Sequence, residues 1–451
     1  MDQSYKYILV AFPYPSGDGL HIGHVYNYAI VDSYCRFLKA AGHKVFQPFG
    51  YDAFGLPAEN YARKVGRDPK EVTYENIEKF RKQMQRMDTG FEEKLITSDE
   101  SYQRWTQKLF TELHKHDLAY KAEGQVPYCH SCETVLAREQ IVKHHVIPLD
   151  TGKGNNVIDI CERCKTPVVE KELEQWYFKI TKYKDRLIKN LDWIDYPEST
   201  INAQRKWLEN LHDWCVSRQR KWGCPIPIEG ETDTLDTFVD SSFYYVRYCD
   251  SDNENELCAK DKYKQVDLYV GGSEHACMHL IYARFIHMFL YDIGVVPTEE
   301  PFKKVIHQGM ILKNGEKMSK TKGNVISPDN YDSDELRFYL MFIGPYTDGG
   351  SWSDQHMAGV QRFVAKMKRW MEQPDAQNID EQFKNNFEKF SKQVFEDTKK
   401  MKFNKVVSGF MSFYNNNKNS IVDAETKEEI ISLLEIYMPG IRQKIILPQT
   451  A

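Results

Sequence analysis

The sequence has 451 residues, which is enough for two to four domains and a large buried core. Its hydrophobic share of 41% and aromatic share of 13% exclude a disordered chain. Its net charge of −5 excludes a general attraction to nucleic acid, so any such site has to be a local patch. It contains neither an apolar run of 18 residues nor a charged and then apolar leader, which predicts a cytoplasmic protein with no membrane partner.

A strand, a turn and a helix are predicted within the first forty residues. An apolar run begins at Tyr7, a cluster of Pro, Gly, Ser and Asp breaks it, and a helix is expected from about His21 to Leu38. A strand that enters a helix through a glycine-rich turn is typical of phosphate-binding folds. The glycine spacing fits neither a Walker A loop nor a GxGxxG turn, but His21 and His24 lie on one face of the helix start.

A second strand is expected over 44–50, and with the first strand and helix it predicts a parallel βαβ unit. Residues 70–122 are charged and helical in period, whereas 125–175 form a compact insertion that carries four cysteines.

Strands are predicted again late in the chain, at 266–272 and 305–310, around a long helix with an apolar stripe. From about residue 354 the pattern is helical. The strand units near 1–60 and 265–345 are separated by a long insertion, so one active site would be assembled from both.

Four of the ten cysteines form two CxxC pairs: Cys129, Cys132, Cys161 and Cys164. Two such pairs surround one tetrahedral ion as thiolates, and Zn²⁺ is the usual occupant, so the spacing predicts a structural zinc site. The alternative is two unrelated thiol pairs or a redox pair. His144 and His145 lie between the pairs and are expected to be loop or supporting residues rather than ligands.

These patterns predict an α/β fold: a split Rossmann-like catalytic domain with a parallel sheet, an inserted zinc module and a C-terminal helical bundle. The expected parts are the first half of the catalytic domain, the zinc-binding insertion, the rest of the connective region with the second half of the catalytic domain, and the bundle. In chain order they are 1–122, 123–175, 176–345 and 346–451.

A lysine-rich stretch bounded by glycines, 315–323, contains Lys317 and Lys320. Taken alone, it is typical of a solvated charged loop. Taken with His21 and His24, it indicates a second set of donors that would clamp a nucleoside triphosphate from the other end of the catalytic domain. A loop bounded by glycines is able to close after ATP binds.

Glu274, His275 and His279 are expected to open a helix, with the two histidines at positions i and i+4. This spacing permits metal binding, but the sequence has no HExxH motif here. Packing of the two rings is a stronger alternative, and contact with substrate or ribose is the interpretation that we favour.

Together these residues resemble the class I aminoacyl-tRNA synthetases, and specifically the leucyl-tRNA synthetases. The class signatures are 21–24 (HIGH) and 317–321 (KMSKT). The leucyl character lies in further stretches, which include 12–17, 52–60, 213–223 and 271–279. The resemblance covers roughly residues 5–370.

The chain also departs from the family that it resembles. The family's large hydrolytic editing domain is missing, because Trp207 is followed almost at once by Asp213. The stretch between Pro227 and Glu231 is shortened, and the helical tail after residue 370 resembles a reduced anticodon-arm bundle.

The resemblance implies that ATP, with Mg²⁺, and an amino acid react at this site to form an aminoacyl adenylate. The residues implied to act on the phosphates are His21, His24, Lys317 and Lys320. The residues implied to contact the nucleotide are Gly23, Gly272, Glu274, Met310 and Ile311. The residues implied to contact the amino acid are Phe12, Tyr14, Asp52, Phe238, Ser241, Tyr244, His275 and His279. Among them, Asp52 is expected to meet the ammonium group.

The resemblance therefore implies a monomeric enzyme that activates leucine, or a similar aliphatic amino acid, and transfers it to tRNA without editing. One alternative is a stand-alone paralogue that passes the activated amino acid to a carrier protein or a small metabolite. A further alternative is a non-catalytic binding or regulatory module, which the intact signature residues disfavour.

Overall fold

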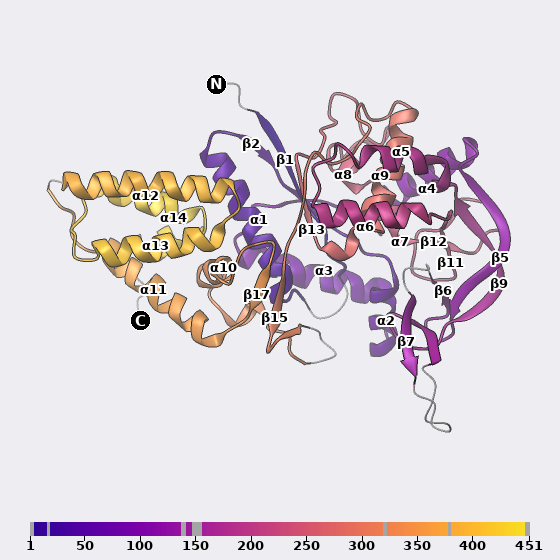
Figure 1. Ribbon diagram of the computed structural model, residues 1–451, viewed down its shortest axis with the longest axis horizontal. Coiled ribbons are helices and arrows are strands. Elements are labelled where there is room, and N and C mark those ends of the chain that lie inside the picture. Colours follow the sequence, from indigo (N-terminus) through magenta and orange to yellow (C-terminus); the bar gives the residue numbers. More distant parts are fainter. Residues whose placement is uncertain are drawn as a thin grey trace.

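A computed structural model describes residues 4–15, 19–136, 141–146, 156–318, 323–377 and 380–446. Central parallel strands stand between two regions of the molecule. Figure 1 shows a bundle of helices at one end and an insertion with two long strands at the other.

The central sheet has four parallel strands in the order β14-β13-β1-β2. They are β1 (Tyr5–Val10), β2 (Lys44–Phe46), β13 (Leu268–Gly271) and β14 (Val305–His307). Helix α1 (Ile22–Ala40) connects β1 to β2, which confirms the predicted βαβ unit. Because strands from two distant parts of the chain pair in one sheet, the predicted split Rossmann-like fold is confirmed.

The predicted strand over 44–50 is broken at Gln47. Its first part is β2, and its second part, β3 (Pro48–Tyr51), pairs with β4 (Glu92–Ile96) outside the central sheet. Strand β4 also corrects the helical prediction for 70–122, because it separates two helices there. The helices of this first half are α2 (Leu56–Val65), α3 (Pro69–Arg86) and α4 (Glu100–Lys115).

The predicted strand over 305–310 is also broken, after β14. The chain turns at Gly309, where a Cβ would collide with the backbone of Gly349. It then enters a separate three-stranded sheet of β15 (Met310–Lys313), β16 (Glu316–Lys317) and β17 (Gly349–Ser351).

Both faces of β1 are buried, because its side chains alternate between two hydrophobic cores. Ile8 and Val10 pack with α1, α10 (Ser333–Phe342) and the bundle. Tyr7 and Leu9 pack with α4 and α9 (His279–Asp292). The central strands therefore hold the two regions of the molecule together.

The insertion is built on the long antiparallel strands β5 (Ala119–Cys129) and β9 (Val169–Phe178), with β6 (Thr134–Val135) and β10 (Trp214–Cys215) at the edges. A hairpin of β7 (Ile141–Val146) and β8 (Asn156–Cys161) carries His144 and His145, which lie on a strand and not in a loop. The other elements of the connective region are η2 (Ile180–Tyr183), α5 (Lys184–Asn190), α6 (Glu198–Glu209), β11 (Ser217–Arg218), β12 (Thr234–Leu235), α7 (Thr237–Ser241) and α8 (Tyr244–Tyr248).

The junction at which an editing domain is expected in the family is short. Helix α6 ends at Glu209 and β10 begins at Trp214, with only residues 210–213 between them. Residues 156–318 are described without a gap, and within them no additional folded domain interrupts this junction.

The helical pattern predicted from residue 354 is confirmed. The bundle comprises α11 (Asp354–Met371), α12 (Glu381–Lys399), α13 (Phe403–Asn417), α14 (Ala424–Glu435) and α15 (Ile441–Ile446). The fully buried Arg337 of α10 donates to Asp32 Oδ2 at 2.7 Å and to the Tyr437 carbonyl at 3.2 Å, which ties the bundle to α1. Across the described ranges, no helix has both the length and the apolar character needed to cross a membrane.

Candidate active site

Helix α1 begins at the two histidines of the first signature, which cap each other's backbone. Nδ1 of His21 accepts the Gly23 N–H at 3.0 Å, and Nδ1 of His24 accepts the His21 N–H at 3.2 Å. This is a capping box built from histidines, and the ring centroids stack 3.8 Å apart. Because Nδ1 is the acceptor in each ring, the proton of the neutral imidazole sits on Nε2, which is the donor.

Gly23 has a steric role in this arrangement. A Cβ at this position would stand 2.9 Å from Cε1 and 3.0 Å from Nδ1 of His21. A larger residue would push the His21 ring away from the backbone that it caps.

Two adjoining cavities lie where β1, β13 and β14 end. We name the larger one, of about 1450 Å³, the outer cleft, and the smaller one, of about 700 Å³, the inner cavity. Ligands of open α/β sheets bind at this edge, where strand order changes direction. The two cavities share the lining residues Gly23, His24, Gly272, Glu274, Gln308 and Lys317. Residues from both halves of the split fold thus meet at one place, as the sequence predicts.

The outer cleft brings together the residues predicted to contact the nucleotide. His21, Met310 and Ile311 line it in addition to the shared residues. Lys317 is exposed at the end of the β15–β16 hairpin, and its carbonyl accepts a hydrogen bond from Asn324 Nδ2 at 3.3 Å. Lys320 lies outside the described residues.

The inner cavity brings together only part of the residues predicted to contact the amino acid. Phe12, Tyr14, Phe238 and His275 line it. The other four are buried and are not among its lining residues: Asp52, Ser241, Tyr244 and His279. The Tyr244 ring stacks on Phe12 at a centroid distance of 4.0 Å, so it supports the cavity wall from behind.

Asp52 is a buried carboxyl group directly behind this wall. The Thr237 hydroxyl donates to its Oδ1 at 2.9 Å, whereas Oδ2 makes no hydrogen bond to the described residues. Burial raises the pKa of Asp52 to about 8, because an uncompensated charge is costly in the interior. An orphaned acceptor of this kind is suited to a cationic ligand group.

The turn after β13 differs from the predicted helix start. His275 lies in the 3-10 helix η3 (Ser273–His275), and Met278 leaves the helical region before α9 begins at His279. The prediction that both histidines open one helix is therefore wrong. The carboxylate of Glu274 folds back over Gly272, so a Cβ at this position would displace the Glu274 side chain from its place over the turn.

Two arginines that the sequence did not assign to the substrate site also line the inner cavity, although Arg220 belongs to a basic stretch, with Arg218 and Lys221, that is a candidate for tRNA contact. Arg220 follows β11, and Arg163 lies between Cys161 and Cys164. The position of Arg163 inside the second CxxC pair could have indicated that its backbone is held close to the metal site.

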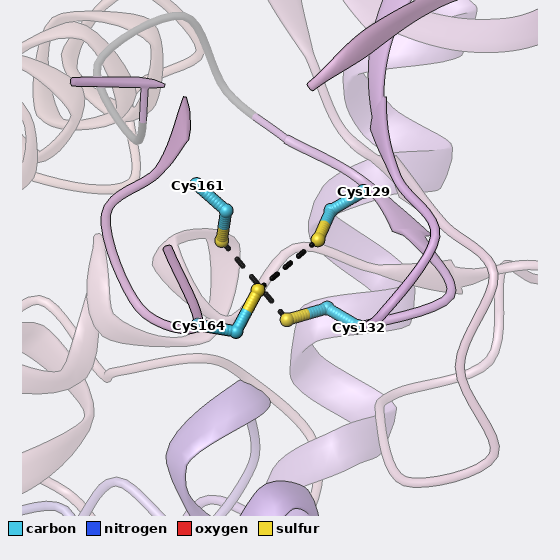
Figure 2. A group of neighbouring side chains, drawn as sticks. All are labelled: Cys129, Cys132, Cys161 and Cys164. Carbon is cyan, nitrogen blue, oxygen red and sulfur yellow. Dashed lines mark hydrogen bonds between the residues drawn. The ribbon is translucent and has the colours of Figure 1, made fainter. Parts of the chain in front are cut away.

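The four predicted thiols point toward one another where β5 and β8 end (Figure 2). Their sulfur atoms all lie within 4.8 Å of one another, and Cys129 Sγ is 3.3 Å from Cys164 Sγ. Four thiolates bound at about 2.3 Å from one Zn²⁺ have similar separations, so the donor set fits this ion. His144 is exposed and does not belong to this group.

The fold and the two cavities define the catalytic core of a class I aminoacyl-tRNA synthetase. A family model described as tRNA synthetases class I (M) matches residues 6–364, and the chain belongs to this family.

Within this class, the chain is similar to leucine–tRNA ligases. The enzyme of Clostridium kluyveri is 30% identical over 688 residues, which cover 95% of this chain and 83% of the relative. The enzyme of Clostridium tetani is 30% identical over 700 residues, which cover 96% and 84%. The chain is thus an ATP-dependent aminoacyl-tRNA ligase of the leucyl-tRNA synthetase type. Because the first alignment is longer than this chain, the relative contains stretches with no counterpart here.

Solved structures confirm the fold. The ternary complex of the Agrobacterium radiobacter LeuRS with tRNA and LeuAMS has a TM-score of 0.86 at 23% identity, over 99% of this chain and 85% of that chain. The Mycobacterium tuberculosis methionyl-tRNA synthetase in complex with methionyl-adenylate has a TM-score of 0.76 at 19% identity, over 98% and 93%.

Proposed function

We propose that the chain activates leucine with ATP in the two cavities and transfers the leucyl group to tRNA without an editing step. The observation that carries this proposal is the wall shared by the two cavities. His24 comes from the first signature and Lys317 from the second, and both line the outer cleft and the inner cavity.

The outer cleft is the proposed ATP site. The N-terminus of α1 carries a partial positive charge, and the Nε2 donors of His21 and His24 add hydrogen bonds for phosphate oxygens. We propose that both Lys317 and Lys320 hold the departing pyrophosphate. The backbone of Met310 and Ile311 would meet the adenine. Mg²⁺ would accompany the nucleotide as its counter-ion.

Ribose contacts are proposed for the turn after β13. Gly272 lets the backbone approach closely, and the Glu274 carboxylate is an acceptor for ribose hydroxyls. Both residues line the outer cleft, which supports this assignment.

The inner cavity is the proposed leucine site. Phe12 and Phe238 present aromatic walls for an aliphatic side chain. Tyr14 lines the cavity in front of Asp52, whose charge would receive the ammonium group. His275 completes the lining, and Ser241, Tyr244 and His279 would act through the residues in front of them.

The chemistry requires placement more than proton transfer. The leucine carboxylate is ionised at neutral pH, so its oxygen bonds to the α-phosphorus of ATP while the bond to pyrophosphate breaks. The terminal ribose hydroxyl of the tRNA then attacks the acyl carbon, and AMP leaves. The residues of the cavities orient both reactants and stabilise charge on the phosphate oxygens.

A hydrophobic pocket distinguishes one methylene by only about 1–3 kcal/mol, so errors are expected unless a second site removes them. Because α6 is followed so closely by β10, we propose that this chain releases its product without hydrolytic correction.

The test is a charging assay with leucine and a tRNA pool, in which ATP consumption is measured in parallel. The proposal predicts leucyl-tRNA, with an ATP cost of about one per product even when isoleucine or methionine is added. Leucine activation without any charged tRNA would contradict the proposed acceptor and would point to a carrier protein or a small metabolite. An ATP cost well above one would contradict the absence of editing.

A further inference from the structure

Helix α6 has a buried face that carries two polar residues and lies behind the turn that follows β13. Thr200, Gln204 and Leu208 recur every four residues, and their exposed fractions are 2%, 0% and 0%. Buried hydroxyl and amide groups require hydrogen-bond partners, and here these partners lie in the turn after β13 or directly behind it.

The first connection runs from Thr200 through His307 to Gly271. His307 Nδ1 is 3.0 Å from the Gly271 carbonyl oxygen, and His307 Nε2 is 2.7 Å from Thr200 Oγ1. A carbonyl only accepts, so Nδ1 carries the proton and donates. Burial lowers the pKa of His307, which keeps the ring neutral. Nε2 therefore accepts the hydrogen bond of the Thr200 hydroxyl.

The second connection runs from Gln204 to Ala276. Gln204 Nε2 donates to the Ala276 carbonyl at 2.8 Å, and Arg284 Nη1 donates to Gln204 Oε1 at 2.9 Å. The Glu300 carboxylate fixes this guanidinium through two hydrogen bonds of 2.8 Å. The amide is therefore held in one orientation, with its donor toward the turn.

The two connections reach the two ends of one short segment. Gly271 and Ala276 enclose Gly272, Ser273, Glu274 and His275, of which the first three line the outer cleft. The helix itself is held at its far end, because residues 210–213 lead directly into β10, which pairs with β9. A side chain of α6 thus braces each end of the segment.

We propose that Thr200 and Gln204 are positioning residues, which hold the 271–276 segment at the depth at which Gly272 and Glu274 meet ATP. The inference rests on the proposed function for the identity of the ligand. Neither residue lines either cavity, so both act through His307 and through the backbone of the segment.

The variants are Thr200→Val, which keeps the shape and removes the donor, and Gln204→Glu, which keeps the acceptor for Arg284 and removes the donor for Ala276. Leu208→Ala is the matched control, because it lies on the same buried face and makes no contact with the segment through a polar group. Thr200→Ser restores the hydroxyl. The readouts are the dissociation constant for ATP by calorimetry, the KM for ATP in leucine-dependent pyrophosphate exchange, and the melting temperature.

We expect Thr200→Val and Gln204→Glu each to weaken ATP binding by about 5- to 20-fold, while kcat at saturating ATP changes much less. Leu208→Ala is expected to lower the melting temperature at least as much and to leave the ATP constants within about twofold. Thr200→Ser should return the constants to the wild-type values. The inference would be overturned if the dissociation constant and KM for ATP worsened in proportion to the loss of melting temperature in every variant, Leu208→Ala included. It would also be overturned if Thr200→Ser bound ATP as weakly as Thr200→Val. Wild-type protein that binds ATP without exchange would overturn the proposed function instead, and the calorimetric comparison would still decide the positioning role.

Discussion

Gln83 connects the start of α1 with the segment that follows the second signature: its Nε2 donates to Asp329 Oδ2, 246 residues away in the sequence, at 2.8 Å. The same amide accepts the Leu20 N–H at its Oε1, at 2.7 Å. Leu20 immediately precedes His21, and Asp329 lies in the 3-10 helix η5 (Pro328–Asn330), which follows the second signature. Helix α3 thus ties the start of α1 to η5.

This bridge predicts a role for Gln83 in ATP use. Gln83→Leu removes both hydrogen bonds and is expected to raise the KM for ATP in pyrophosphate exchange by about tenfold. Arg86→Ala is the control, because Arg86 forms an exposed ion pair with the same Asp329 carboxylate, and such pairs contribute about 0–1 kcal/mol. Equal effects of the two variants would contradict the special role of Gln83.

Two substitutions of His24 can distinguish its role in capping α1 from its role in catalysis. Glutamine is a natural capping-box residue at the position of His24, so His24→Gln is expected to preserve the melting temperature within a few degrees. It removes the Nε2 donor and should lower kcat of exchange about 10²- to 10³-fold. His24→Ala should lose both activity and, through the lost cap, about 0.5–2 kcal/mol of stability. Full exchange activity in His24→Gln would show that the ring does not act on the phosphates.

Much of the fold follows from local patterns. The apolar run from Tyr7 and the helix after His21 each carry their own periodicity, and the predicted strand and helix are confirmed. The spacing of the two CxxC pairs likewise predicts that the four thiols lie together, as they do in the structure. The predicted strand over 44–50 is interrupted at Gln47 because its two parts pair with different strands, β2 with β1 and β3 with β4, and such pairing is not visible in the local sequence. The β4 strand was missed since its neighbours on both sides are helical.

The supporting residues of the site could not be predicted in the same way. The spacing of Thr200, Gln204 and Leu208 is a visible signal of one helix face, but His307 and Ala276 are 107 and 72 residues away from their partners on α6. Only the tertiary fold brings such pairs together.

The buried carboxyl of Asp52 predicts a pH dependence of leucine binding. Its pKa of about 8 means that the ammonium partner must compete with a proton below that pH. The KM for leucine is therefore expected to fall as pH rises from 6 to 8, by about tenfold per unit, and to level off above. Asp52→Asn should raise KM and abolish this slope. A KM for leucine that is flat between pH 6 and 8 in the wild type would exclude the assignment of Asp52.

The raised pKa of Asp52 also predicts that the stability of the fold decreases as pH rises. The folded-state pKa of about 8 lies above the ordinary value of 3.8, so the native state binds more protons than the unfolded state between these values. Asp52 therefore lowers stability progressively as pH rises from about 4 to 8. The melting temperature of Asp52→Asn relative to wild type should increase over this range, as measured by calorimetry at several pH values. A constant difference would indicate that the carboxyl titrates normally.

The four-thiolate site predicts a defined zinc content. Cys132→Ser is expected to lose about one equivalent of zinc per chain, measured by elemental analysis, because three thiolates hold a structural ion much less tightly. Since Arg163 lies between two of the ligands and lines the inner cavity, the KM for leucine should rise as well. Cys215→Ser, outside the cluster, is the control and should keep both the zinc and the KM. Unchanged zinc in Cys132→Ser would contradict the site.

The most direct test of the central claim is leucine-dependent exchange of pyrophosphate into ATP by the purified chain in the absence of tRNA. A single site assembled from His24 and Lys317 predicts rapid exchange with leucine and loss of exchange in both His24→Gln and Lys317→Ala, with each variant still folded. Absence of exchange with leucine and with every other aliphatic amino acid would contradict it.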